Sequence, residues 1–209
     1  MYNIGMWLFE RSVGLAALRN KKAKLWRDGR RNIFDRMSDS IKPNEDIVWV
    51  HCASLGEFEQ GRPIIEQIRK INPSIKILLT FFSPSGYEIR KNYEGADYIF
   101  YLPIDRRSYV RRFMDIVNPK AAIFIKYEFW RNYLRELHKN DVPAYSISSI
   151  LRPNQIFFRW YGKQSDPIPL RYVKQIPGMS GLMGLLDKPA GVDWPEEEVK
   201  ELVDYVHSC

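Results

Sequence analysis

The sequence has few of the residues that would give it a disulfide framework or a membrane-spanning segment. It holds two cysteines in 209 residues, Cys52 inside an apolar run and Cys209 at the last position, so disulfides are not expected to staple the fold. The apolar run near the amino terminus is interrupted by Glu10 and Arg11, and it is shorter than the roughly 20 residues of a spanning helix. A positive leader with an unbroken apolar centre is also missing, which argues against a signal peptide. A reducing compartment is the better expectation.

Motifs for metal, nucleotide or nucleophile chemistry are also scarce. The chain has three histidines, without the spacing of a zinc site, and it contains neither a nucleophile elbow, a Walker loop nor a G-x-G-x-x-G turn. His51 and Cys52 are adjacent in a predicted strand, so their side chains point to opposite faces and cannot share one metal ion. No metal or cofactor is therefore expected.

Positive charge is plentiful, and it is concentrated near the amino terminus. The formal net charge of +7 suits an anionic partner, which could be nucleic acid, a membrane surface or a phosphorylated substrate. Met1, Ile4, Leu8, Leu15 and Leu18 recur near helical spacing, and a strongly basic stretch with an embedded tryptophan spans residues 19–31.

An apolar helix that leads into such a basic stretch is typical of a helix lying in an anionic membrane interface. The alternative is an amphipathic helix that packs on its own domain with a solvated basic face. Nucleic acid is not an expected partner, because no recognised binding motif accompanies the charge. The residues predicted to contact the membrane are Trp7, Lys21, Lys22, Lys24, Trp26, Arg27, Arg30 and Arg31.

From residue 46 onward, short apolar runs alternate with helical patterns. The predicted strands are Ile47–Cys52, Ile77–Phe82, Tyr98–Leu102, Ala121–Ile125 and Ala144–Ile150. Their nearly continuous apolar character is the signature of parallel strands covered on both faces. The predicted helices between them are Gln60–Ile71, Ser85–Asn92, Ser108–Val117 and Trp130–Lys139. The alternation predicts an α/β protein with a doubly wound, Rossmann-like parallel sheet and helices on both faces.

Three segments are expected along the chain. Residues 1–40 would form the membrane-associating helix and basic segment, and residues 41–162 the Rossmann-like domain. Residues 163–209 form a tail that continues no strand–helix rhythm, with one short helix predicted at Asp193–Val206.

Glu57 is the leading candidate for chemistry. It follows the strand Ile47–Cys52 and the small residues Ser54 and Gly56, and ligands of α/β sheets bind at the carboxyl ends of strands. A carboxylate there can remove a proton from a substrate hydroxyl if burial or a neighbouring acid such as Glu59 raises its pKa. On spacing alone, the alternative is an acidic residue that stabilises a helix amino terminus.

Two further strand ends carry polar residues. Ser83, Ser85 and Gly86 join a strand to a helix, where hydroxyls and backbone amides suit an oxyanion such as phosphate or simply cap the turn. In the third strand end, Lys126 and Glu128 are flanked by aromatic residues, which suits a sugar or lipid headgroup, or a structural ion pair.

Taken together, these segments resemble the bacterial Kdo (deoxy-manno-octulosonic acid) transferases of lipid A assembly. The likeness runs from about Tyr2 to Gly162 and rests on five ordered motifs. These are Trp49–Glu57, Thr80–Glu88, Tyr101–Asp105, Phe113–Pro119 with the strand Ala121–Ile125, and Glu128–Trp130.

The resemblance implies the amino-terminal, acceptor-side half of a GT-B glycosyltransferase at the cytoplasmic face of the bacterial inner membrane. Such enzymes transfer Kdo from CMP-Kdo to a lipid A precursor with inversion and without a bound metal. By the match, Glu57 is the catalytic base and Glu128 a supporting acid in the acceptor cleft. The other expected acceptor-binding residues are Ser54, Gly56, Ser83, Ser85 and Gly86, and the basic run faces lipid phosphates.

In this family a second Rossmann domain follows and holds the CMP-sugar. Residues 163–209 do not resemble that domain. They are too few for such a domain, since even one βαβ unit needs about 30 residues. We therefore expect this chain alone to be inactive. The alternatives are a glycosyltransferase that uses another sugar nucleotide and a non-catalytic lipid-binding module at the membrane surface.

Overall fold

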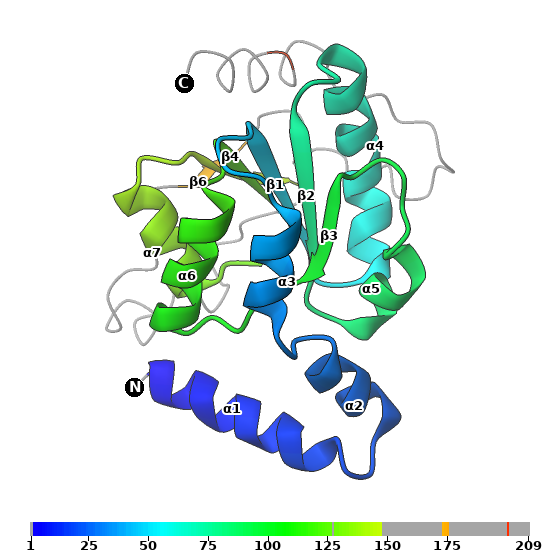
Figure 1. The fold of residues 1–209 in the computed structure, drawn as a ribbon, viewed down its shortest axis with the longest axis vertical. Coiled ribbons are helices and arrows are strands. Elements are labelled where there is room, and N and C mark those ends of the chain that lie inside the picture. The colour runs from blue at the N-terminus through cyan, green and yellow to red at the C-terminus, as the bar shows by residue number, and fades with distance from the viewer. Residues whose placement is uncertain (1, 127, 148–172, 176–199, 201–209) are drawn as a thin grey trace.

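The computed structural model describes residues 2–126, 128–147, 173–175 and 200. Within them, a six-stranded parallel sheet has the strand order β3-β2-β1-β4-β5-β6 (Figure 1). The order reverses beside β1 (Ile47–Cys52), which pairs with β2 (Lys76–Phe81) on one side and with β4 (Ala121–Ile125) on the other. This is the doubly wound arrangement that the sequence predicts.

The central strands form because their residues are apolar on both faces. All residues of β1 and β4 are buried, and both strands have the predicted bounds. The flanking strands are β3 (Tyr98–Tyr101) and β5 (Ala144–Ile147), each close to its predicted range. Positions 148–150, where a longer β5 was predicted, lie outside the described residues.

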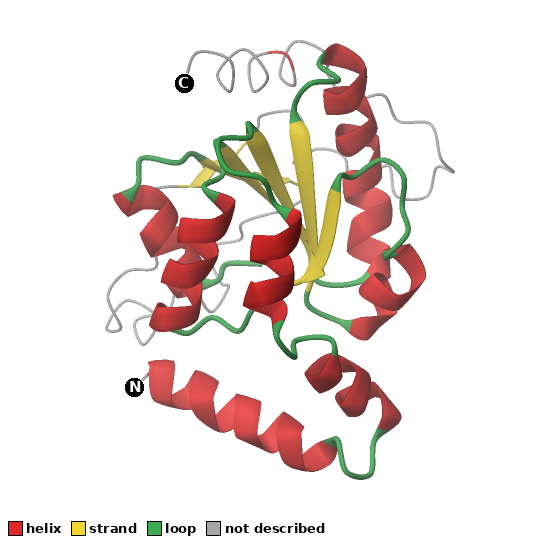
Figure 2. Ribbon diagram, viewed as in Figure 1, coloured by secondary structure: helices red, strands yellow, loops and turns green. Residues whose placement is uncertain are grey.

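Helices cover both faces of the sheet (Figure 2). On one face, α4 (Leu55–Ile71) and α5 (Pro84–Arg90) pack against a core that includes Val48, Val50 and Cys52. On the other face, α3 (Ile33–Ser40), α6 (Arg107–Val117) and α7 (Arg131–Lys139) pack around Trp49. Alternate residues of β1 therefore enter two separate cores.

The tail was predicted to continue no strand–helix rhythm, and this is wrong for three of its residues. A short strand β6 (Val173–Gln175) pairs in parallel with β5, in the register Ala144↔Val173. A strand this short leaves little periodic signal in the sequence. The helix predicted at Asp193–Val206 lies outside the described residues except for Lys200.

The amino-terminal segment forms two helices before α3. These are α1 (Tyr2–Ala16) and α2 (Lys21–Asp28), which lie together beyond one end of the sheet, below it in Figure 1. Side-chain contacts join α1 to the body of the protein: the Tyr2 hydroxyl donates to Asp105 (2.5 Å), and Glu10 forms an ion pair with Arg106 (2.9 Å). Across the described part of the chain, no helix combines the length and apolar character needed to cross a membrane.

Candidate active site

The carboxyl ends of the strands bring the predicted site residues to one edge of the sheet. Glu57 lies in the first turn of α4, directly after β1, and Glu128 lies between β4 and α7. Because β1 and β4 are neighbours and the strand order reverses beside β1, the two carboxylates flank the switch point of the sheet. This is the position where doubly wound proteins bind ligands.

Glu57 is half-buried, and its side chain turns back to its own strand end. Its Oε2 accepts a hydrogen bond from the backbone N–H of Ala53 at 2.5 Å. Burial raises the pKa of Glu57, and the negative charge of Glu128 raises it further, against the opposing effects of the Ala53 N–H, His51 and Lys126. A carboxylate with a raised pKa is a stronger base than a free one, as a group that removes a hydroxyl proton requires.

Glu128 is held by the residue that starts α7. Its Oε2 accepts from the indole Nε1 of Trp130 at 2.9 Å, and it lies 3.5 Å from Nε2 of His51. The indole Nε1 also lies 3.2 Å from His51 Nε2. Glu128, Trp130 and His51 therefore form a compact polar cluster beside Glu57.

The two small-residue turns after β1 and β2 lie side by side. The backbone N–H of Ser83 donates to the carbonyl of Ala53 at 2.8 Å, which ties the turns together. Ser83 precedes α5, and its hydroxyl accepts from the Ser85 N–H and lies 3.0 Å from the Ser85 hydroxyl. Ser54 is half-buried, whereas Gly56 and Ser85 are exposed, so hydroxyl and backbone groups are accessible at this edge.

Gly86, which was predicted to bind the acceptor, has a packing role in the structure. It is buried. A Cβ built on it would lie 2.3 Å from the Phe81 ring and 3.1 Å from the backbone carbon of Ser54. The missing side chain lets α5 approach the end of β2 and the neighbouring turn.

Of the residues predicted to contact the membrane, Trp26 is buried and Arg30 is partly buried. Trp26 is 7% exposed, and its ring lies edge-on to Phe9 and Phe82 at 5.7 and 5.8 Å. A basic surrounding sequence does not reveal that one face of α2 packs on the sheet edge. The other residues predicted to contact the membrane are exposed, namely Trp7, Lys21, Lys22, Lys24, Arg27 and Arg31.

Arg30 connects α2 to the strand ends. Its nitrogens donate to the backbone carbonyls of Leu102 (2.8 Å), Phe82 (2.9 Å) and Trp26 (3.1 Å), and its guanidinium lies 3.9 Å from the centroid of the Trp26 ring. Burial lowers the pKa of Arg30 to about 9, so the group remains charged at neutral pH. It is a structural cation that orders the site edge.

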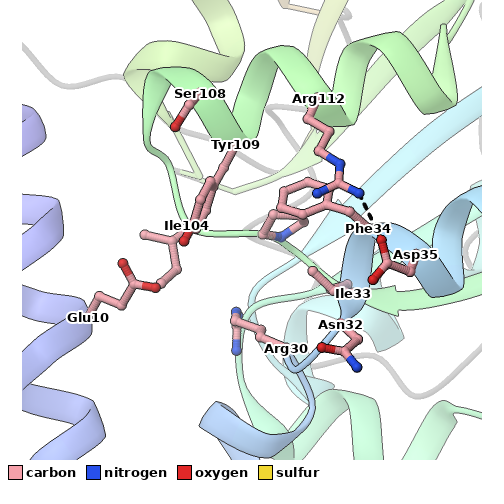
Figure 3. Close-up of a pocket in the computed structure, with 11 residues that line it drawn as sticks. Glu10, Arg30, Asn32, Ile33, Phe34, Asp35, Ile104, Ser108, Tyr109 and Arg112 are labelled. Carbon is pink, nitrogen blue, oxygen red and sulfur yellow. Dashed lines mark hydrogen bonds and ion pairs between the residues drawn. The ribbon is translucent and has the colours of Figure 1, made fainter.

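A cavity of about 480 Å³ lies on the far side of Arg30, between α1, α3 and α6 (Figure 3). Arg112 and Asp35 form an ion pair of 2.8 Å across its rim, and Glu10 projects toward it from α1. Glu10 also forms an ion pair with Arg106. Glu10, Asp35 and Arg112 at the cavity therefore all have charged partners within the fold. The cavity does not include Glu57 or Glu128.

Sequence reasoning missed His51 and Asp105 as site-organising residues. His51 was considered only as a metal ligand, whereas it is fully buried and contacts the Glu128 cluster. Asp105 accepts from the backbone N–H groups of Asn132 (3.1 Å) and Tyr133 (3.2 Å) and so caps α7 from another loop. A polar residue within an otherwise apolar strand or motif was the available signal for both.

No group of three or more His, Cys, Asp or Glu side chains among the described residues could hold a metal ion. His51 and Cys52 point to opposite faces, as predicted: Cys52 lies in the core under α4, and His51 faces Phe124 and Trp130.

Comparison with known proteins separates the tail from the rest of the chain. Residues 154–209 match the model of the D-mannonate dehydratase family. A 53-residue stretch is 53% identical to the mannonate dehydratase of Lachnoclostridium phytofermentans, covering 25% of this chain and 15% of that protein. A solved structure of a UDP-N-acetylglucosamine 2-epimerase overlaps with a TM-score of 0.47 at 9% identity, covering 70% of this chain and 46% of that one, which is too low a likeness to carry an argument.

The larger part of the chain matches another family. It is 34% identical over 116 residues to the 3-deoxy-D-manno-octulosonic acid transferase of Aquifex aeolicus, covering 54% of this chain and 32% of that protein. The corresponding protein of Haemophilus influenzae is 30% identical over 102 residues, covering 48% and 24%. The chain thus spans about a third or less of these relatives. The family model matches residues 27–165, more than half of the chain, so this chain belongs to the 3-deoxy-D-manno-octulosonic-acid transferase (kdotransferase) family.

Proposed function

We propose that this chain provides the acceptor side of an inverting glycosyltransferase that moves Kdo from CMP-Kdo to a lipid A precursor. The observation that carries the proposal is Glu57, a half-buried carboxylate with a raised pKa at the carboxyl end of the central strand. The family match and the names of the relatives supply the reaction class and the sugar.

In the proposed reaction Glu57 is the general base. It removes the proton from an acceptor hydroxyl while the oxygen attacks the anomeric carbon of Kdo, and CMP leaves from the opposite side with the bonding electrons. Glu128 keeps a negative charge near Glu57 and so favours proton uptake by it. Ser54, Gly56, Ser83, Ser85 and Gly86 would line the acceptor site, with Gly86 giving the turn its close packing.

The donor would be bound by a second domain, as in the two-domain arrangement that the family resemblance implies. Residues 154–209 resemble part of a mannonate dehydratase, and we assign them no role in transfer. We therefore expect no Kdo transfer by this chain alone, and activity once a relative supplies the donor side.

The test is a mass-spectrometric assay with CMP-Kdo and a lipid A precursor. The assay uses the chain itself and a hybrid, in which its family-matched residues replace the equivalent part of the Aquifex aeolicus transferase. We expect the hybrid to transfer Kdo and Glu57→Gln to reduce the rate at least about 100-fold, since a general base contributes this much. Glu59→Gln is the matched control, because Glu59 lies on the same helix but pairs with Arg90 (2.6 Å).

Retained transfer in the Glu57→Gln hybrid would remove Glu57 as the base. Product from the chain alone would show that it binds the donor and would overturn the expectation of inactivity. Transfer from another sugar nucleotide would favour the second glycosyltransferase hypothesis. Lipid binding without transfer in the hybrid would favour the non-catalytic module.

We also propose that the amino-terminal helices rest on an anionic membrane surface, on its cytoplasmic face. Exposed apolar side chains on and after α1 support this, among them Leu15 (71%) and Leu18 (76%). Exposed Lys21, Lys22 and Lys24 follow directly, and such cations contribute about 1 kcal/mol each near an anionic surface. Replacing all three by Glu should abolish binding to anionic vesicles in a sedimentation assay, whereas Lys139→Glu, on α7, should not.

A further inference from the structure

His51 is a polar residue in the most apolar part of the protein. It lies in β1, its relative exposure is 0%, and its ring packs against Trp49, Phe124 and Trp130. The proposed transfer reaction assigns it no role. A buried imidazole is costly unless both ring nitrogens have partners, so the two partners define its function.

The first nitrogen determines where the proton lies. Nδ1 is 3.1 Å from the backbone carbonyl oxygen of Thr80, which can only accept a hydrogen bond, and 2.9 Å from the Thr80 hydroxyl. The Trp49 indole N–H also donates to this hydroxyl at 2.8 Å. The carbonyl therefore requires a proton on Nδ1.

The second nitrogen faces the proposed acid. With the proton on Nδ1, Nε2 of a neutral ring is an acceptor, and the indole N–H of Trp130, which can only donate, lies 3.2 Å away. That same N–H reaches Glu128 Oε2 at 2.9 Å, so one hydrogen is shared between the imidazole and the carboxylate. The three atoms lie within 3.5 Å of one another.

We propose that His51 is a positioning residue for Glu128, acting through the shared indole N–H of Trp130. Thr80, in β2, holds the His51 ring in place, the ring orients Trp130, and Trp130 positions the Glu128 carboxylate. The inference rests on the proposed function for its catalytic meaning, but the arrangement itself can be tested without turnover.

The experiment compares the folded full chain with His51→Asn, His51→Gln and Trp49→Phe by NMR. The Asn amide can replace Nδ1 toward Thr80 and removes Nε2, whereas the Gln amide reaches the place of Nε2. Trp49→Phe is the control, because it removes another donor to Thr80 without touching Glu128. The probes are the Trp130 indole ¹H–¹⁵N signal, assigned with Trp130→Phe, and the Glu128 side-chain carboxyl ¹³C signal.

We expect the parent chain to carry a proton on Nδ1 of His51, with Nε2 accepting from Trp130. In His51→Asn both probe signals should shift, in His51→Gln they should shift less, and in Trp49→Phe they should stay in place. A proton on Nε2 in the parent chain would overturn the proposal, even if the variants failed to fold. Unmoved signals in folded His51→Asn would overturn it as well and leave His51 a core residue.

In the active hybrid, His51→Asn should lower kcat about tenfold with little change in KM for the acceptor, because a displaced catalytic group slows the chemical step. His51→Gln should recover part of the loss. An equal kcat in the parent hybrid and His51→Asn would contradict the proposal. A hybrid without any transfer would count against the proposed function, and the NMR comparison would still decide the role of His51.

Discussion

Two carboxylates at opposite ends of the strands of one sheet have pKa values shifted in opposite directions. Asp97 lies at the amino end of β3, where its Oδ2 accepts from the backbone N–H of Ile77 at 2.8 Å. Glu57 lies at the carboxyl end of β1 and likewise accepts from a backbone N–H, that of Ala53. Yet the pKa of Asp97 is lowered and that of Glu57 is raised.

The difference comes from the neighbours. Burial tends to raise the pKa of both groups, but Asp97 also has the Ile77 N–H and two cations, Arg69 and Lys76, which lower its pKa below the usual range. Glu57 instead faces the negative charge of Glu128. At the amino ends of the strands, Asp97 binds two cations and stabilises the fold. At the carboxyl ends, Glu57 has a raised pKa and takes up a proton more readily.

The largest expected stability effect is at Asp97. Asp97→Asn should lower the free energy of unfolding at pH 7 by about 1–3 kcal/mol, because charged hydrogen bonds to Ile77, Arg69 and Lys76 are lost or weakened. Since the folded-state pKa is lowered, the stabilisation is complete above the unfolded-state pKa of about 3.9 and disappears as the pH falls through the lower folded value.

Urea denaturation at neutral and acidic pH measures this loss. The exposed Asp115 of α6 provides the control, because Asp115→Asn should have little effect. Equal losses in the two variants would mean that the amino-edge pairing does not stabilise the fold.

Glu57→Gln should have a smaller effect of the opposite sign. The raised pKa means that the charged form costs folding free energy, a cost that appears as the pH rises from about 4.3 through the folded-state pKa. The variant should therefore be more stable than the parent at pH 7, by less than about 1 kcal/mol because solvent reaches the group. At pH 4 the variant and the parent should have the same Tm. A variant less stable than the parent at pH 7 would contradict the view that the charged form of Glu57 costs folding free energy.

The smallest effect concerns the coupling between the two acids. Glu128→Gln should lower the pKa of Glu57, because it removes the nearby negative charge while burial, the larger cause, remains. A ¹³C NMR titration of the Glu57 carboxyl measures this change. Glu59→Gln should leave the titration in place, and the same curve in all three proteins would show that Glu128 does not act on Glu57.

The sequence predicted the sheet well because its strands are nearly pure apolar runs. The bounds of β1 and β4 were predicted correctly, since both strands are buried on both faces. The start of α4 was predicted at Gln60 and lies at Leu55. Small residues such as Gly56 suggested a turn, but a first helical turn tolerates them and favours the acidic Glu57.

The site was only partly predictable. Glu57 and Glu128 could be placed at strand ends from pattern and resemblance, and the structure brings both to the same edge. The burial of Trp26, the backbone hydrogen bonds of Arg30 and the contacts of His51 depend on residues far along the chain, namely Phe82, Leu102 and Trp130. No local pattern encodes such tertiary partners, so Trp26 and Arg30 were predicted to contact a membrane together with the rest of the basic segment.

The three hydrogen bonds from Arg30 to backbone carbonyls determine where a shortened form of this protein should begin. A chain shortened to begin after Ser40 keeps every strand of the sheet but loses the donor that satisfies the Phe82 and Leu102 carbonyls. Phe82 and Leu102 directly follow β2 and β3, at the same edge of the sheet as Glu57. In such a fragment the turns after β2 and β3 would be less well held, and ligand binding measured on it would differ from that of the whole chain. The shortest useful fragment therefore keeps α2 and Arg30.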